Sequence, residues 1–205
     1  MAKISLSPLI VDIRNKVADV VYSKWRGINY ARARVTPANP RTQAQIRVRN
    51  SLARMVDFFQ HIHMWIRNSW NILAKGKDYS GYNLFVGHNR TREQAINLID
   101  LSIYPKLPRN LEKLTVSSPS AGVIQVGFLP SPVPTGYRLI LHFRQKPTGE
   151  EKKTLHRVEV LLPGATTPQN FSEFPSGTVW QVYGVLGSEV EQLTGISLAD
   201  EVIVT

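Results

Sequence analysis

The sequence predicts an α+β protein, in which a β-hairpin and helices are followed by an all-β sandwich. Three observations favour this fold class. Polar and apolar residues alternate on both sides of Gly27, apolar residues recur at helical spacing between residues 42 and 75, and the second half consists of short alternating runs separated by Pro- and Gly-rich turns. Two prolines and a change of periodicity at residues 104–110 indicate a linker. We therefore expect a basic hairpin–helix domain over residues 1–105 and a β-sandwich domain over residues 106–205.

The hairpin is predicted from residues 15–24 and 28–35, which alternate as strands do and are joined by the turn 25–27. Gly27 can adopt the positive φ that a tight hairpin turn needs. The apolar segment before the hairpin, residues 2–13, is expected to pair either with this sheet or with the edge strand of a neighbouring copy. Because side chains alternate along a strand, the second strand is expected to have one basic, aromatic face and one face of small residues: Ile28, Tyr30, Arg32 and Arg34 against Ala31, Ala33 and Val35.

The helical part is predicted to begin at Thr42, because a glutamine follows three residues later in a capping-box arrangement. From there, apolar residues recur at helical spacing up to Gly76, which is a suitable stop. One helix of about 50 Å and two helices with a break near residues 61–63 both fit this pattern. Two shorter helices are expected next, one from about Ser80 and one from about Thr91.

The second half is predicted to form six or seven short strands, which is typical of a β-sandwich. In number, length and order these strands resemble a fibronectin type III-like domain. The resemblance covers residues 110–205, concerns architecture alone, and implies a module that binds, spaces or assembles. The predicted strands lie at residues 111–118, 122–129, 137–145, 153–162, 179–187 and 200–205.

Composition narrows the classes of function. A hydrophobic content of 42% with 20% charged residues indicates a folded chain. The absence of cysteine excludes disulfides, thiolate metal sites and cysteine nucleophiles. No apolar run approaches the ~18 residues of a membrane-spanning helix, and we recognise no secretory signal. We therefore expect no membrane partner, whereas a virion, the nucleoid and an extracellular filament all stay open as locations.

The positive charge of the chain is asymmetric. The net charge is +10; residues 1–100 contain 16 Lys and Arg against 6 Asp and Glu, and residues 101–205 contain nine of each. All of the excess therefore lies in the first half. Such an asymmetry suggests an acidic partner for that half. The alternatives are a basic face that contacts only solvent and one that faces acidic groups of a sister subunit.

The basic and aromatic residues of the first half are the candidate binding site. Guanidinium groups bind phosphate in a bidentate way, and aromatic side chains stack on bases. No helix carries the Asn, Gln and Arg pattern that reads base edges, so we expect contact with the phosphate backbone regardless of sequence. DNA is favoured, and RNA remains an alternative. The candidate nucleic-acid-binding residues are Arg14, Lys16, Lys24, Trp25, Arg26, Tyr30, Arg32, Arg34, Arg41, Arg47, Arg49 and Arg54.

The sequence predicts no catalytic residues, no metal site and no cofactor. His61 and His63 diverge by roughly 200° on a continuous helix and cannot share an ion. His61 and Asp57 are four residues apart, which suits a hydrogen-bonded pair, but no third ligand is near in sequence. No Gly-x-Ser-x-Gly motif or phosphate-binding loop is present. We therefore expect a protein that is not an enzyme and has no small-molecule substrate.

Three segments carry a resemblance to a family of uncharacterised bacterial proteins of roughly this length. They are "GINY" after the tryptophan-led turn, "PANPRTQAQIRVR" at the start of the helical part, and "YSGYNLFVGHN" near its end. The relatives commonly carry Trp-Lys-Gly at the turn, where this chain has an arginine in place of the lysine. The resemblance supports the architecture and supplies no catalytic residues. Proteins of this kind also look like accessory or structural products of phages and mobile elements.

Together these observations predict a structural protein without enzymatic activity that coats or packages DNA as a multi-subunit assembly. The basic first half would contact the phosphates, and the neutral sandwich would face outwards or join copies. The alternative is a homopolymeric subunit of a virion or an extracellular filament, whose basic half contacts protein. In both cases we expect the chain to form homo-oligomers or filaments.

Overall fold

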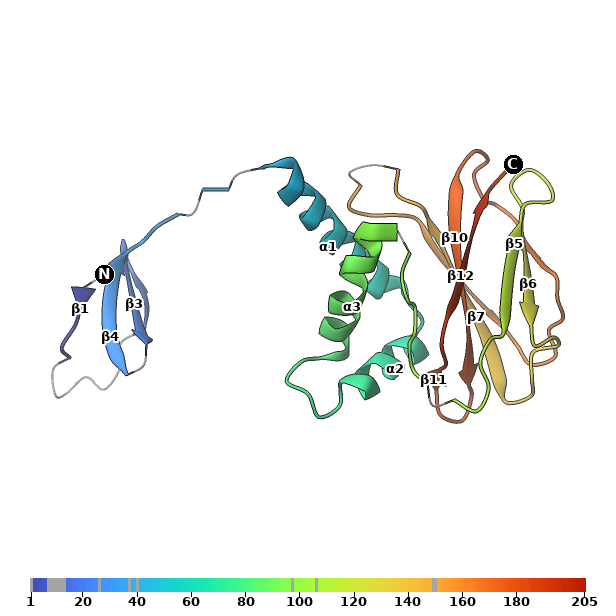
Figure 1. Cartoon of the computed structure of the whole chain (residues 1–205), viewed down its shortest axis with the longest axis horizontal. Coiled ribbons are helices and arrows are strands. Elements are labelled where there is room, and N and C mark those ends of the chain that lie inside the picture. Colours follow the sequence, from blue (N-terminus) through green and yellow to red (C-terminus); the bar gives the residue numbers. More distant parts are fainter. Residues whose placement is uncertain are drawn as a thin grey trace. The chain divides into compact units, whose positions relative to one another are not determined.

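The computed structural model describes residues 2–6, 14–25, 27–36, 38–39, 41–96, 98–105, 107–148 and 151–205. The chain forms two compact units, Met1–Arg41 and Thr42–Thr205 (Figure 1). The first is a small β-sheet, and the second combines three helices with a β-sandwich. The predicted α+β fold class is confirmed.

The N-terminal unit is a four-stranded antiparallel sheet with the strand order β1-β4-β3-β2. The predicted first strand is in fact two strands, because Ala18, with a φ of 47°, turns the chain between them. The predicted turn at Gly27 is confirmed, with a φ of 82°. At the N-terminus, β1 pairs with β4 of the same sheet, while residues 7–13 of the predicted arm lie outside the described residues. The strands are β1 (Ala2–Lys3), β2 (Asn15–Val17), β3 (Val20–Trp25) and β4 (Ile28–Ala33).

The second unit begins with helices α1 (Gln43–His61), α2 (Met64–Ala74) and α3 (Gly81–Ile96). Thr42 is the N-cap of α1, and its side chain accepts a hydrogen bond from the backbone N–H of Gln45. A break separates α1 from α2, which decides between the two arrangements that the sequence allows.

The two short helices expected after α2 are one continuous helix, α3. Ser80 caps its start, because its side chain accepts a hydrogen bond from the N–H of Asn83. Thr91 lies inside this helix and does not begin a new one. The capping residue expected at Thr91 therefore does not start a new helix here, because tertiary packing of the surrounding helix outweighs this local preference.

The sandwich contains two antiparallel sheets. One has the order β5-β6-β9, and the other has the order β11-β10-β7-β8 with β12 paired to β10. The sheets β5-β6-β9 and β8-β7-β10-β12 form the predicted fibronectin type III-like sandwich; the short strands β9 and β11 are absent from the prediction. The strands are β5 (Lys113–Ser117), β6 (Ile124–Leu129), β7 (Tyr137–Gln145), β8 (His156–Leu161), β9 (Gln169–Phe171), β10 (Val179–Ser188), β11 (Leu193–Thr194) and β12 (Leu198–Ile203).

The larger sheet is buried on both of its faces. Leu141 and Val182 belong to the core between the two sheets, whereas Ile140, Tyr183 and Val185 belong to a second core with the helices. Figure 1 shows the helices beside this sheet. The strand β10 is consequently buried at every position but one, and β7 is buried from Leu139 to Arg144.

The predicted domain boundary at residues 105 and 106 is therefore displaced. The compact units divide at residues 41 and 42. The physical reason is the second core: Phe58 and Trp70 from the helices pack with residues of β7 and β10, so the helical segment and the sandwich share one interior. The prolines at residues 104–110 mark a connection within that unit.

Candidate functional site

One face of the N-terminal sheet gathers basic side chains. Lys16 of β2 and Arg32 of β4 both lie opposite Val21 of β3, and directly paired residues share a face. Tyr30, two residues before Arg32 in β4, lies on the same face and is opposite Lys3 of β1. The three cationic residues are exposed and Tyr30 is half-buried. We call Lys3, Lys16, Tyr30 and Arg32 the basic face.

The opposite face of this sheet is mainly apolar. Tyr22 pairs with Ala31 and Val20 pairs with Ala33 on that side. Lys24 belongs to this opposite face, because it pairs with Asn29 in the same alternation. The predicted separation of small and basic residues along β4 is thus confirmed, whereas Lys24 lies on the opposite side from Arg32.

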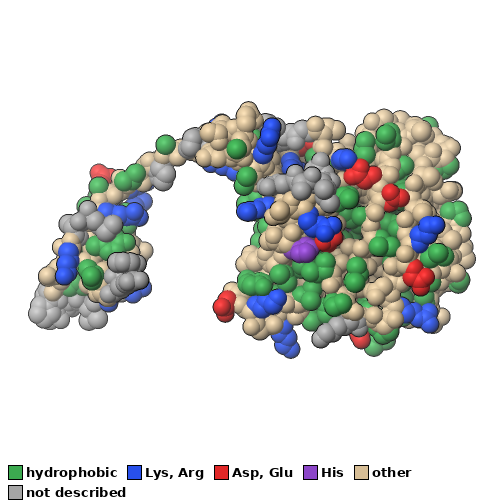
Figure 2. All heavy atoms as spheres, viewed as in Figure 1, with side chains coloured by type: hydrophobic (Ala, Val, Ile, Leu, Met, Phe, Trp, Pro, Cys, Tyr) green, Lys and Arg blue, Asp and Glu red, His purple; other side chains and the backbone are tan. Residues whose placement is uncertain are grey.

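The other predicted basic residues of the first unit lie outside its strands. Arg14 precedes β2, Arg34 follows β4, and both are exposed. The backbone N–H of Arg34 donates to the carbonyl oxygen of Asp19 at 2.7 Å, which holds the chain beside the sheet just after β4. Arg41 is exposed at the end of this unit, while Arg26 and the side chain of Trp25 lie outside the described residues. Figure 2 shows Lys and Arg side chains at the surface of this unit.

The three predicted arginines on α1 have different environments. Arg47 and Arg49 are exposed, but Arg54 is buried, with a relative exposure of 9%. The Nε of Arg54 donates to Oε1 of Glu93, and its Nη1 donates to the backbone oxygen of Glu151 at 3.0 Å. Arg54 is therefore removed from the candidate phosphate-binding set.

Arg54 is part of a buried polar network between the helices and the larger sheet. Nη2 of Arg144, on β7, lies 3.7 Å from the same Glu93 oxygen, and Nη1 of Arg144 donates to Oε1 of Gln181 at 3.4 Å. The Tyr183 hydroxyl donates to that Gln181 oxygen at 3.0 Å. The Glu93 and Arg144 side chains are both fully buried. Glu93 therefore offsets part of the positive charge that Arg54 and Arg144 place in the interior.

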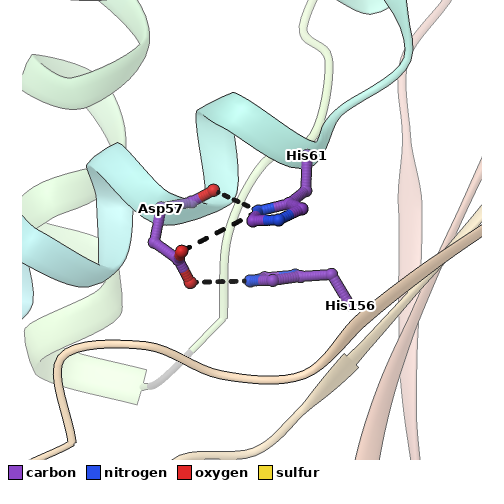
Figure 3. Close-up of side chains that lie close together, drawn as sticks. All are labelled: Asp57, His61 and His156. Carbon is purple, nitrogen blue, oxygen red and sulfur yellow. Dashed lines mark hydrogen bonds and ion pairs between the residues drawn. The ribbon is translucent and has the colours of Figure 1, made fainter.

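A second polar cluster joins α1 to β8 (Figure 3). Nε2 of His156 lies 3.1 Å from Oδ2 of Asp57, and Nδ1 of His61 lies 3.8 Å from Oδ1 of Asp57. Nδ1 of His61 also lies 2.7 Å from the backbone oxygen of Asp57. The two imidazole rings are stacked, with centroids 4.6 Å apart and an interplanar angle of 14°. We call Asp57, His61 and His156 the Asp–His cluster.

Two further groups, one side chain and one backbone N–H, support the Asp–His cluster. Nε2 of His142 is hydrogen-bonded to Nδ1 of His156 at 3.1 Å, and the backbone N–H of Thr154 donates to Oδ2 of Asp57 at 3.2 Å. Burial lowers the pKa of His142 well below its usual range and lowers the pKa of His156 to about 4. Both imidazoles are therefore neutral near pH 7.

Two residues of these sites are missing from the prediction. Lys3 joins the basic face because β1 pairs with β4, and the alternation of the N-terminal segment is a weak signal for such a strand. His156 is 99 residues from Asp57, so no spacing rule connects them.

Among the described residues, no helix has both the length and the apolar character needed to cross a membrane.

The sequence of residues 12–89 matches a family described as a family of unknown function (DUF6266). This stretch contains the turn at Gly27, the start of α1 and the start of α3, which are the three segments that carry the resemblance noted from the sequence. It ends before the sandwich, and the family description contains no phage association. No curated protein matches the sequence.

Solved structures similar to the chain include two fibronectin type III domains. The domain of human collagen alpha-1(XX) has 11% identity and a TM-score of 0.37, covering 47% of this chain and 85% of that one. The FN5 domain of Drosophila Lar has 9% identity and a TM-score of 0.31, covering 46% and 96%. A family 76 glycoside hydrolase from a bovine Bacteroides thetaiotaomicron strain has 15% identity and a TM-score of 0.39; 45% of this chain is covered, but only 20% of the hydrolase. These likenesses identify no enzyme family.

Proposed function

We propose that this protein is a non-enzymatic structural protein that binds nucleic acid, through contacts between the basic face of its N-terminal sheet and the phosphate backbone. The observation that carries the proposal is the strand register, which brings Lys3, Lys16 and Arg32 to one face together with Tyr30. Cationic groups on a flat sheet bind a polyanion, and the tyrosine ring can stack on a base.

The dimensions of the basic face suit a nucleic-acid strand. Lys16 and Arg32 are two strand spacings apart, which corresponds to about 10 Å, or about three phosphates at 3.4 Å of axial rise each. The unit that holds them, residues 1–41, contains eight Lys and Arg against two Asp. The charge needed to attract phosphate is thus concentrated in one fifth of the chain.

The test measures binding to a fixed duplex DNA at increasing salt, with matched duplex RNA and single-stranded DNA as parallel ligands. Each phosphate contact contributes about 0.9 to the slope of log K against log salt on B-DNA. We expect Lys16→Ala and Arg32→Ala each to reduce the slope by about one unit. Lys24→Ala is the matched control: it removes the same kind of charge from the opposite face and leaves the slope unchanged.

Two results would contradict this proposal. The wild-type chain could show no salt-dependent binding to any of the three ligands, or Lys24→Ala could reduce the slope as much as Lys16→Ala does. The second result would show that net charge matters and the face does not.

A homopolymeric subunit, of a virion or an extracellular filament, is the second candidate, and one observation favours it. Among the described residues of 2–41, no side chain is buried, and Val17 is 64% exposed. Sheets of this size need a covered apolar face to be stable, and a second copy of the same sheet would supply one. Electron microscopy of nuclease-treated protein tests this: filaments without nucleic acid support it, and monodisperse monomers contradict it.

A further inference from the structure

We propose that the Asp–His cluster is a binding site for a divalent transition-metal ion of the Zn²⁺ type. Asp57 and His61 lie one turn apart on α1, and His156 comes from β8. One ligand atom from each residue lies within 4.8 Å of the other two. This site is separate from the basic face and does not depend on nucleic-acid binding.

Two distances between the ligand groups can be compared with those of a tetrahedral site. Metal–ligand bonds of about 2.0–2.2 Å place two donor atoms about 3.3–3.5 Å apart in a tetrahedral zinc site. The two distances to the carboxylate oxygens of Asp57 are 3.1 Å from His156 and 3.8 Å from His61. The His156 nitrogen therefore already lies at a coordinating spacing from Asp57, whereas the His61 ring must rotate to bring its nitrogen, now within 4.8 Å of the other two ligand atoms, to such a spacing.

The chemical nature of the ligands selects the ion. Two imidazoles and one carboxylate suit Zn²⁺ and its first-row neighbours, and suit Mg²⁺ or Ca²⁺ poorly because these prefer oxygen ligands. Three protein ligands leave a fourth position, which water or an anionic group can fill. Two of the proposed ligands, Asp57 and His61, line a cavity of about 480 Å³ whose lining also includes Lys146, Glu151, Lys153 and Thr154.

The surroundings fix two of the three ligands and leave the third adjustable. His142 behind His156 and the N–H of Thr154 on Asp57 are the kind of outer hydrogen bonds that orient metal ligands. The side chains of Asp57 and His156 are 8% and 2% exposed, whereas that of His61 is 49% exposed. The His61 ring can therefore turn when an ion enters, and exchange its hydrogen bond to the Asp57 backbone oxygen for coordination.

The alternative is a hydrogen-bonded cluster that never binds an ion. The test titrates Zn²⁺ and Co²⁺ into the full chain, purified without a histidine tag and treated with a chelator. We expect one ion per chain by calorimetry and the visible absorption of tetrahedral Co²⁺. We also expect His61→Ala to weaken binding by more than the roughly 10–100-fold that loss of an outer hydrogen-bond partner costs.

His88→Ala is the matched control, because His88 is also paired with an aspartate, Asp100, at 2.7 Å, outside the cluster. It should bind both ions as the wild type does. His156→Ala provides a second test, and far-UV circular dichroism checks that this variant folds. If it does not fold, His61→Ala still tests the proposal, because the His61 side chain is half-exposed. Absence of 1:1 binding by the wild type, or unchanged affinity in His61→Ala, would overturn the proposal.

Discussion

At the scale of single residues, the interior of the larger unit depends on a few ionised groups. Glu93 is fully buried and lies against Arg54 and Arg144, so one carboxylate is the shared counter-charge of two guanidinium groups between the helices and the sheet. Removing one member of a buried ion pair leaves an unpaired charge in a medium of low polarity. Glu93 is therefore the residue whose charge matters most to this interface.

We expect Glu93→Gln to lower the free energy of unfolding by about 3–5 kcal/mol. The amide keeps the shape of the side chain but leaves two buried arginines without a counter-charge. Glu189→Gln is the control, because Glu189 forms a partly exposed pair with Arg138 at 2.7 Å, and exposed pairs contribute about 0–1 kcal/mol. Urea unfolding of both variants measures the difference; equal effects would show that Glu93 does not hold the arginines.

At the scale of elements, the packing of α2 on the larger sheet depends on a glycine. A Cβ at Gly187, in β10, would lie 2.8 Å from Cε3 of Trp65 and 3.3 Å from the Leu193 oxygen. Trp65, on α2, is itself buried. The absence of a side chain at this one strand position thus allows a helix to lie close to the sheet.

Two glycine-to-alanine substitutions should consequently have opposite effects. Gly187→Ala forces Trp65 away from the sheet and should destabilise the unit by about 1–3 kcal/mol. Gly87→Ala, on α3, meets no atom within 4 Å and should stabilise it by about 0.5–1 kcal/mol through helix propensity. Thermal unfolding followed by circular dichroism checks both signs. A stabilised Gly187→Ala variant would contradict the close packing of α2 on β10.

At the scale of the whole molecule, the helices and the sandwich form one folding unit. The outer face of the larger sheet carries Ile140, Tyr183 and Val185, which pack with the helices. His142 and Arg144 lie on the same face, and both are fully buried. A sandwich without helices would expose these side chains and remove the charge partner of Arg144.

Fragments of the chain test this unit. We expect residues 42–205 to unfold in one cooperative transition at the same denaturant concentration as the main transition of the full chain. Residues 106–205 should be much less stable, and should bind a hydrophobic dye, because the helix-facing side of the sheet is exposed. A fragment 106–205 as stable as 42–205 would restore the boundary that the prolines at 104–110 suggest.

The sequence by itself determined the features that depend on neighbours along the chain. The cap at Thr42, the turn at Gly27 and the alternation in β4 are local, since a turn or a cap is stabilised within a few residues. The positions of the six longer sandwich strands along the chain were also predictable, because alternation and turn residues repeat along the second half.

Only the tertiary structure decided which charged and titratable side chains meet when they lie far apart in the sequence. Arg47 and Arg54 are both arginines on α1, yet their environments differ. Arg54 is buried and paired with Glu93, which is 39 residues away along the chain, whereas Arg47 is exposed. In the same way, the packing of α1 on β8 brings His156 to Asp57 across 99 residues. Burial and long-range pairing are consequences of how elements pack, and no local pattern records them.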